Sequence, residues 1–514
     1  MRPMSSFPFR TMAASLLGLL VAMTTSHADE PGPWVSLSST GKLAYRALPT
    51  GDRIMDFSSA GYGGGGVVIP DVPVKATVQP GGSDSADIQK AVDMVSQMPL
   101  VNGHRGAVLL GAGTYHCDQP IKITADGVVL RGSHGTILQL TGQPHVAILA
   151  SGNQRIAETG KPTPITDAYV PSGTDTFNVA SATGLQVGDI IRISRPVTDI
   201  WVAFMGMNNL LRTGRDEHWI SGTLQAERTI RAIAGNRLTV TPPLSDNYDA
   251  KYLNPPGSTV VKVQVSGTIS QIGIESLRIE CPPQPVEITV PLFQAVKFDS
   301  VVDSWMQDLE THDTVNTLGV DGKSSRITIR KIHMTHTVAT KGAAKPFDIS
   351  NAGTQVLVDQ CTGQGDSLFY FATMGRTQGP NVILHCAFQG GGSIQPHMRW
   401  STGLLVDNCQ VPAGSIDLMN RGVMGSGHGW TIGWSVAWNC QAKSFLIQQP
   451  PGSMNWAIGC KGAESSKAMP GGDAKTILPN GIFASPNSHV APASLYLAQL
   501  RERLGDQALK NIGY

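Results

Sequence analysis

The sequence predicts an all-β protein folded as a right-handed parallel β-helix, a solenoid with an N-terminal capping helix, an inserted β-subdomain and a C-terminal helix. Three observations predict it. From about residue 300, short apolar runs recur every 20 to 31 residues. No helical pattern separates these runs, and the chain has 57 glycines but only 15% charged residues. A repeat of this length made of short strands is typical of a solenoid.

One column of aliphatic and cysteine residues defines the repeat. Each member follows an apolar run and precedes a turn that carries Gly or Asn: Leu309, Ile332, Cys361, Cys386, Cys409, Cys440 and Cys460. Residues stacked on neighbouring coils lie about 4.8 Å apart, which is close enough for a disulfide. A row of cysteines on successive coils is more typical of a buried ladder of small apolar groups, so we expect a ladder, with one bridge inside it as the alternative.

The N-terminus has the pattern of a secretory signal peptide, which we assign to residues 1–28. Arg2 and Arg10 are its positive residues, residues 12–23 are a short apolar core, and cleavage is expected after Ala28. No later segment reaches about 18 consecutive apolar residues, so the sequence predicts no membrane span. We therefore expect a secreted or periplasmic protein.

The mature chain divides into four predicted segments. Residues 29–150 form the N-terminal cap and the first coils, with a helix that begins at Asp84 or Ser85 as N-cap. Residues 151–265 lose the coil rhythm and are interpreted as the inserted β-subdomain. Residues 266–465 are the main coils. Residues 466–514 are a C-terminal tail and one amphipathic helix over 494–512 that closes or flanks the end of the solenoid.

The stretch from Asp84 to Gly132 carries a family resemblance. Its helix is followed by Gly-Ala-Gly-Thr-Tyr (111–115) and by Val-Val-Leu-Arg-Gly (128–132). In these motifs, and in the rhythm of the later coils, the chain resembles the pectate-lyase-like superfamily of β-helix proteins. The resemblance implies a protein that acts on polysaccharides. Because that superfamily contains lyases, hydrolases, epimerases and phage tailspikes, the chemistry must be argued from the site residues.

A predicted outward face brings basic residues together. Aligning Ser367, Ser393, Ser415 and Ser444 places Leu368, Ile394, Ile416 and Phe445 in the core, and strand alternation then turns every second residue outward. The outward rows are Phe369, Gln395, Asp417 and Leu446; Phe371, His397, Met419 and Gln448; and Thr373, Arg399, Arg421 and Pro450. Arg399 and Arg421 are then neighbours on adjacent coils, about 5 Å apart.

This arrangement favours a polysaccharide lyase that cleaves a uronic-acid polymer by β-elimination. Arg399 and Arg421 would neutralise the uronate carboxylate, and His397 would take the C5 proton. Substrate contacts are expected from Gln395 and Asp417, and from ring stacking on Trp400, Trp430 and Trp434. In the alternative interpretation, the arginines form salt bridges with Asp417 and His397 is a hydrogen-bonded surface residue.

A second group of residues favours an inverting glycoside hydrolase. Asp313, His336 and Asp366 follow the first strand of three successive coils, which places the two carboxylates about 10 Å apart, near the upper limit for that mechanism. The tripeptide Gly427-His428-Gly429 is similar to one in polygalacturonases, although the other motifs of that family are missing. The same carboxylates could bind Ca²⁺ or simply cap turns. No EF-hand-like run or Cys/His spacing indicates a particular metal.

A third interpretation is a non-catalytic solenoid that binds glycans. The formal net charge of +1 gives no support for nucleic acid as a partner, because nucleic-acid-binding proteins usually carry a basic surplus or stripe. The expected partner is an acidic polysaccharide. The sequence does not indicate an oligomeric state.

Overall fold

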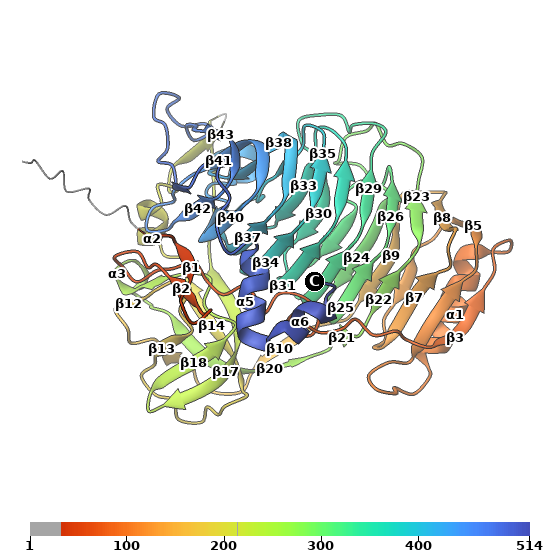
Figure 1. The fold of residues 1–514 in the computed structure, drawn as a ribbon, viewed down its shortest axis with the longest axis horizontal. Helices are drawn as coiled ribbons and strands as arrows, with labels where there is room; N and C mark the ends of the chain where they lie inside the picture. The colour runs from red at the N-terminus through yellow and green to blue at the C-terminus, as the bar shows by residue number, and fades with distance from the viewer. Residues whose placement is uncertain (1–31, 213) are drawn as a thin grey trace, which may run out of the picture. The chain divides into compact units, whose positions relative to one another are not determined.

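The computed structural model of this protein describes residues 32–212 and 214–514 (Figure 1). The predicted signal peptide lies outside these residues. Residues 34–514 form one compact unit, to which the following description applies. None of the helices in the described part of the chain is long and apolar enough to cross a bilayer.

The unit is a right-handed parallel β-helix, as predicted, whose coils each contribute strands to three faces. The strands of face A are β3 (Val74–Val78), β4 (Gly106–Leu110), β7 (Val128–Gly132), β22 (Gly273–Glu275), β25 (Val301–Gln307), β28 (Ser325–Arg330), β31 (Thr354–Asp359), β34 (Gln378–Leu384), β37 (Ser401–Asp407), β40 (Ser435–Trp438), β42 (Asn455–Ile458) and β44 (Ile482–Ala484). Two short strands extend face A: β21 (Ile269–Ser270), which pairs with β25, and β39 (Ile432–Gly433), which pairs with β37.

The other two faces follow in the same coils. Face B contains β5 (Gly113–Cys117), β8 (Thr136–Leu140), β23 (Arg278–Glu280), β26 (Glu310–His312), β29 (His333–Thr335), β32 (Thr362–Gln364), β35 (Ala387–Gln389), β38 (Gln410–Leu418), β41 (Gln441–Ile447) and β43 (Lys461–Ser465). Face C contains β6 (Ile121–Ile123), β9 (Val146–Ser151), β24 (Gln294–Asp299), β27 (Leu318–Val320), β30 (Phe347–Asn351), β33 (Phe369–Thr373), β36 (Ser393–Ile394) and the second halves of β38 and β41.

The corner between faces A and B is closed by one residue in coil after coil. This residue is in the left-handed region, with φ between 49° and 55°, at Ser276, Asp308, Lys331, Gln360, His385, Asn408 and Asn439. The next residue is the predicted column, which is buried from Leu309 to Cys460. All seven cysteines of the protein are free and buried, so the column is a ladder of thiols and aliphatic groups, without a disulfide.

The inserted β-subdomain follows β9 and is antiparallel. Its main sheet contains β10 (Arg155–Glu158), β11 (Thr163–Pro164), β13 (Thr176–Asn178), β14 (Ile190–Pro196), β17 (Thr223–Ala234), β18 (Arg237–Thr241) and β20 (Thr259–Ser266). The smaller elements are β12 (Tyr169–Val170) with β19 (Tyr248–Asp249), β15 (Leu210–Arg212) with β16 (Arg215–Glu217), α2 (Asp199–Phe204) and α3 (Ala250–Leu253). In Figure 1 this subdomain is coloured yellow to yellow-green.

The insert shares a core with the late coils. Trp201 and Trp219 stack with ring centroids 5.1 Å apart, and both contact Trp400 edge-on. Asp246 of the insert is buried and accepts hydrogen bonds from the indole nitrogens of Trp400 (2.8 Å) and Trp434 (3.2 Å). The insert is therefore attached to the solenoid by buried aromatic and polar contacts.

Helices cover the solenoid at two places. α1 (Asp84–Ser96) packs on β3 to β7 with Ile88, Val92 and Val95 buried, as expected for a cap of the first coil, and its N-cap is Ser83 rather than Asp84 or Ser85. The expected single C-terminal helix is two helices, α5 (Leu495–Leu504) and α6 (Asp506–Asn511), because Gly505 between them has φ 79°.

The C-terminal helices flank the solenoid instead of closing its end. Leu495, Tyr496 and Leu500 of α5 pack on the outward apolar column of face A, and η1 (Tyr62–Gly64), β1 (Val35–Leu37) and β2 (Leu43–Tyr45) belong to the N-terminal segment that shares this side. The remaining short helix, α4 (Met424–Gly427), lies between β38 and β39. Apart from α1 at the first coil, the described helices that pack on strands of the solenoid do so on face A, and the candidate sites lie on faces B and C of the later coils.

Candidate active site

Four predicted residues meet at the end of face C and form what we term the basic cluster: His397, Arg399, Arg421 and His428. The rings of His397 and His428 are 4.6 Å apart in an edge-to-face contact. An Nη of Arg421 donates to the carbonyl of His397 (3.1 Å), and the backbone N–H of Arg399 donates to the carbonyl of His428 (3.0 Å). Residues from two successive coils and from the segment after α4 therefore occupy one place.

The backbone turns sharply where the cluster begins. Arg399 and Trp400 are consecutive residues with positive φ, 52° and 54°, a conformation that is uncommon for bulky side chains. Their N–H groups are held by the carbonyls of His428 and Trp430. The result is that Trp400 is buried in the core of the insert, whereas Arg399 remains partly exposed and donates to the hydroxyl of Ser426 (2.8 Å).

The Arg421 guanidinium is buried and forms no ion pair in the described chain, although the nearby Asp417 charge partly offsets the lowering of its pKa by burial. The side chain is 7% exposed, its Nε makes no hydrogen bond within the described residues, and none of the ion pairs found there includes Arg399 or Arg421. The expected alternative partner, Asp417, instead accepts from the side chains of Gln395 and Ser415, each at 2.9 Å. A buried cation that lacks a counter-ion is costly, so its presence needs an explanation.

Both histidines in the cluster are held uncharged. Burial and the nearby charges of Arg421 and Arg399 lower the pKa of His397 to about 4. Burial and the same arginines, together with His397, lower the pKa of His428 to about 3. Burial also lowers the pKa of Arg421 to about 10, which still leaves the guanidinium charged at neutral pH. The Nδ1 atoms of both imidazoles are buried and unbonded within the described chain.

Two aromatic rings form a wall beside the cluster. Phe347 and Phe369 stack at 5.4 Å, His397 lies 5.0 Å from Phe347, and the Arg421 guanidinium lies 5.3 Å from the Phe369 ring centre. The sequence alignment placed Phe369 on this face but did not identify Phe347. The wall provides an apolar surface next to the charged groups.

The Gly-His-Gly tripeptide has a structural basis. Gly427 and Gly429 have φ of 75° and 57°, and a Cβ at either position would collide with Glu217 or Trp219 of the insert. The two glycines therefore allow the segment after α4 to pack closely against the insert, and this packing directs His428 to the cluster. Arg212 of the insert donates to the carbonyl of Gly425 in the same segment.

The predicted register holds in three of the four coils. Ser393, Ser415 and Ser444 pair as expected, and Ile394, Ile416 and Phe445 are buried beside them. The coil of Ser367 does not follow the alignment, because a bulge in β33 pairs Ile394 with Phe371 instead of Leu368. The row of Gln395 holds in the later coils, where Gln395 donates to Asp417 and Asp417 pairs with Leu446.

The tryptophans expected to stack on sugars are not part of the basic cluster. Trp400, Trp430 and Trp434 are at most 3% exposed. Trp400 and Trp434 donate to Asp246, and Trp430 donates to the carbonyl of Met205, so their rings join the insert to the coils. Sequence alone could not distinguish these rings from exposed ones, because the surface that covers them belongs to the insert.

The carboxylates of the second group are occupied by local hydrogen bonds. Asp313 is 7% exposed and accepts from the N–H (2.6 Å) and hydroxyl (2.8 Å) of Thr337. Asp366 is exposed, and one of its oxygens accepts from the N–H of Gly391 (2.6 Å). Asp313 therefore has the turn-capping arrangement that was the alternative to a catalytic role.

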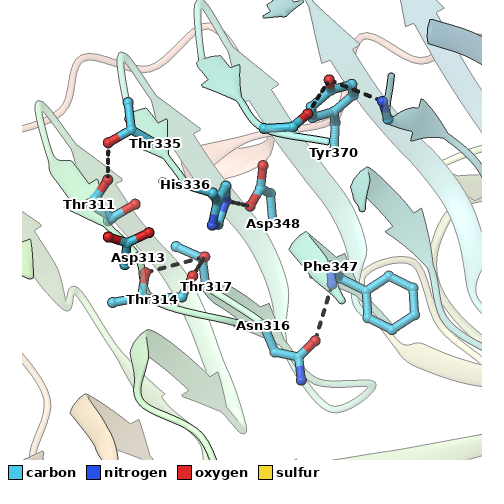
Figure 2. Close-up of polar contacts among 12 residues, drawn as sticks. Thr311, Asp313, Thr314, Asn316, Thr317, Thr335, His336, Phe347, Asp348 and Tyr370 are labelled. Atoms are coloured by element: carbon cyan, nitrogen blue, oxygen red, sulfur yellow. Dashed lines mark hydrogen bonds and ion pairs between the residues drawn. The ribbon is translucent and has the colours of Figure 1, made fainter. Parts of the chain in front are cut away.

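His336 has a partner that the sequence analysis missed. Figure 2 shows Asp348 reaching His336, with Nε2 and Oδ1 2.6 Å apart and both side chains at most 8% exposed. Burial favours the neutral imidazole, but the charge and hydrogen bond of Asp348 outweigh this effect and raise the pKa of His336. One feature of the sequence could have indicated this pair: the acidic residue Asp348 lies between Phe347 and Ile349 in β30, twelve residues after His336.

Within the described chain, no group of three or more His, Cys, Asp or Glu side chains is arranged to hold a metal ion. The expectation that the carboxylates of Asp313 and Asp366 could bind Ca²⁺ thus gains no support from their surroundings.

Comparison with known proteins gives structural matches only. No protein-family model and no curated sequence matches the chain. Among solved structures, the chain is similar to the tailspike gp49 of Pseudomonas phage LKA1 (14% identity, TM-score 0.39, covering 81% of this chain and 79% of that one). It is also similar to the gp54 tailspike of Acinetobacter baumannii phage AP22, in complex with a capsular saccharide (11%, 0.30, 80% and 76%). A third match is the A-module of a mannuronan C-5 epimerase from Azotobacter vinelandii (10%, 0.33, 80% and 74%).

Proposed function

We propose that this protein is a polysaccharide lyase that cleaves a uronic-acid-containing polymer by β-elimination, with the basic cluster as its active site. The observation that carries the proposal is the Arg421 guanidinium, buried beside two uncharged imidazoles, without an ion pair in the described chain and with its Nε unbonded there. A substrate carboxylate would supply the missing counter-ion. Arg399, which is partly exposed, is positioned to bind the same carboxylate.

The reaction requires charge neutralisation at the carboxylate. Removing the C5 proton makes the carboxylate develop enolate character, and a fixed guanidinium stabilises that charge better than water does. The electrons form the C4–C5 double bond as the C4–oxygen bond breaks. Arg421 cannot relax away from this position because Phe369 and the carbonyl of His397 hold its guanidinium.

His397 is assigned the role of base. With its pKa lowered to about 4, it is unprotonated at neutral pH and able to accept a proton. A bound carboxylate would offset the charges of Arg421 and Arg399, so the pKa of His397 would rise in the complex and the imidazole would become a stronger base. The proton that it takes is then available for the departing oxygen. His428, with a pKa of about 3, is neutral and is not an acid at this pH.

The test is incubation with a panel of acidic polysaccharides, following both ultraviolet absorbance and new reducing ends. Elimination leaves an unsaturated uronate that absorbs in the ultraviolet, whereas hydrolysis leaves a reducing end without that chromophore. We expect both signals together from the wild type and neither from His397→Gln. Reducing ends without the chromophore, lost in Asp366→Asn but retained in His397→Gln, would instead identify an inverting hydrolase.

We also propose that the protein is exported to the periplasm or the medium, because acidic polysaccharides are found outside the cytoplasm. N-terminal sequencing of the purified protein tests it, with a mature chain that begins at Asp29 as the expected result.

A further inference from the structure

A second polar site lies at the corner between faces B and C. It is a cavity with a volume of ≈ 400 Å³, and its lining comes from three successive coils. His336, Gln364, Asp366 and Gln389 are among the lining residues, and none of the lining residues is Lys or Arg. The cavity is therefore unlike the basic cluster in charge, and the two share one coil, which contributes Gln389 to the cavity and His397 and Arg399 to the cluster.

The cavity and the basic cluster are joined through one strand. Phe347 and Asp348 are consecutive residues of β30. The ring of Phe347 contacts His397. The carboxylate of Asp348 holds His336 (Figure 2). The buried Asp348 thus fixes His336 at the cavity, while its neighbour Phe347 contacts the basic cluster, so the two places lie near each other on this part of the solenoid. The cavity can serve as the position for a sugar next to the one that is cleaved.

Two amide side chains and one carboxylate oxygen of the cavity have no hydrogen-bond partner within the described residues. Gln364 and Gln389 pair in register on β32 and β35, both are exposed, and neither side chain has a hydrogen bond within the described residues. His336 is fixed through Nε2 by Asp348. Asp366 keeps one carboxylate oxygen beyond the bond from Gly391 and forms no ion pair in the described chain. Amide and carboxylate groups arranged in this way suit the hydroxyl groups of a sugar.

From this arrangement we infer that the cavity binds an uncharged sugar residue and makes the enzyme selective for polymers in which the uronate is next to such a sugar. The inference rests on the proposed function. Its specificity-determining residue is Asp366, whose unpaired carboxylate accepts sugar hydroxyls but repels a second uronate. Gln364 and Gln389 supply the neutral contacts.

The experiment compares two polymers: polygalacturonate, in which every sugar is a uronate, and hyaluronan, in which glucuronate alternates with an uncharged N-acetylhexosamine. Binding is measured by calorimetry in the His397→Gln background, so that it does not depend on turnover, and kcat/KM is measured in the active enzyme. We expect preference for the alternating polymer. Asp366→Asn should keep the bond from Gly391 while reducing that preference about tenfold, the effect of roughly one charge-assisted interaction.

The matched control is Asp308→Asn, which removes the same charge at an exposed turn between faces A and B, outside the cavity. It should leave the preference unchanged. The double variant Gln364→Ala/Gln389→Ala should raise KM for the alternating polymer with little change in kcat. Equal or tighter binding of polygalacturonate, or an Asp366→Asn variant that behaves like Asp308→Asn, would overturn the inference. Absence of cleavage with the binding preference intact would overturn the proposed function alone.

Discussion

At the scale of single residues, Arg421 is the side chain whose placement conflicts most with stability. Removing a charge from water without an ion pair costs several kcal/mol, and here the guanidinium contacts a carbonyl and an aromatic face, while the nearby Asp417 charge offsets only part of the effect of burial. Residues that serve substrate binding are often unfavourable for the fold alone. Activity and stability should therefore respond in opposite directions when Arg421 is replaced.

We predict that Arg421→Met lowers turnover on the acidic polymer about 10²- to 10³-fold, because one neutralising group is lost. The same change should leave the melting temperature unchanged or raise it, because an unpaired buried charge is replaced by an apolar chain of similar length. Calorimetric melting and the ultraviolet assay measure the two effects.

The matched control for this variant is Arg326→Met. Arg326 forms a two-pronged ion pair with Asp303 at 2.6 and 2.8 Å, away from the cluster. Its loss should lower stability and spare activity. The interpretation of Arg421 fails if the two variants behave alike.

The pH dependence of His397 gives a second prediction at this scale. Protonation below a pKa of about 4 abolishes the base, so kcat/KM should rise with pH through about 4 and then level off. In Arg421→Met one repelling charge is gone, and the pKa of His397 should move upward. Titration of the imidazole by NMR, in wild type and variant, measures this shift; a pKa that stays the same would contradict the assigned contacts.

The residues of the cluster could be predicted from the sequence, but the partner of His336 and the burial of the tryptophans could not. The grouping of Arg399, Arg421 and His397 was predicted from the spacing of one coil, which depends only on nearby residues in the sequence. Asp348 was missed because its partner, His336, is on the far side of a loop of variable length. The insert buries the three tryptophans, and the coil pattern does not predict where the insert packs.

At the scale of elements, the strand register predicted from the sequence was right for three coils and wrong for one. Ser393, Ser415 and Ser444 align because short, regular strands follow each of them. The bulge at β33 adds an unpaired residue and breaks the alignment at Ser367. Likewise, the one predicted C-terminal helix is interrupted at Gly505, a position where a left-handed residue ends α5.

The attachment of α5 to face A should depend on pH. Asp407 at the end of β37 accepts from the hydroxyl of Ser494 (2.7 Å) and the N–H of Tyr496 (2.8 Å), and burial raises its pKa to about 6. The unfolded chain has a pKa near 3.9, so the folded protein binds the extra proton between about pH 4 and 6. This contribution to stability is complete below about pH 4 and is lost as pH rises through 6.

We therefore predict that Asp407→Asn, which keeps an acceptor oxygen but cannot ionise, gains in melting temperature relative to wild type as pH rises from about 4 to about 7. The control is Asp506→Asn in α6, whose carboxylate is in an exposed pair with Arg501. A constant difference between Asp407→Asn and wild type over this range would contradict the prediction.

At the scale of the whole molecule, Asp246 connects the insert to the late coils. It binds the indoles of Trp400 and Trp434 and lies 3.6 Å from the buried Nε of Arg195. Loss of this carboxylate would leave one buried cation and two indole donors without their partner. Because the contacts cross from insert to solenoid, we expect the two parts to unfold together.

We predict that Asp246→Ala destabilises the protein by about 3–5 kcal/mol, in the range for breaking a buried charge pair. In chemical denaturation, tryptophan fluorescence and far-ultraviolet circular dichroism should shift together. Glu227→Gln, which removes a more exposed ion pair with Arg192 inside the insert, should change stability by less than about 1 kcal/mol. A fluorescence transition that moves alone would show that the insert unfolds independently.

The one-residue corner between faces A and B restricts how such a protein can diversify. After the first two coils, whose connections at this corner are longer, the corner keeps one length from β22 to β43, and the large changes in length lie at the other two corners. The insert after β9, the loop from 336 to 346 and the segment around α4 all lie at those corners. New recognition loops can thus be exchanged, in evolution or in the laboratory, while the spine of thiols and aliphatic groups keeps its spacing.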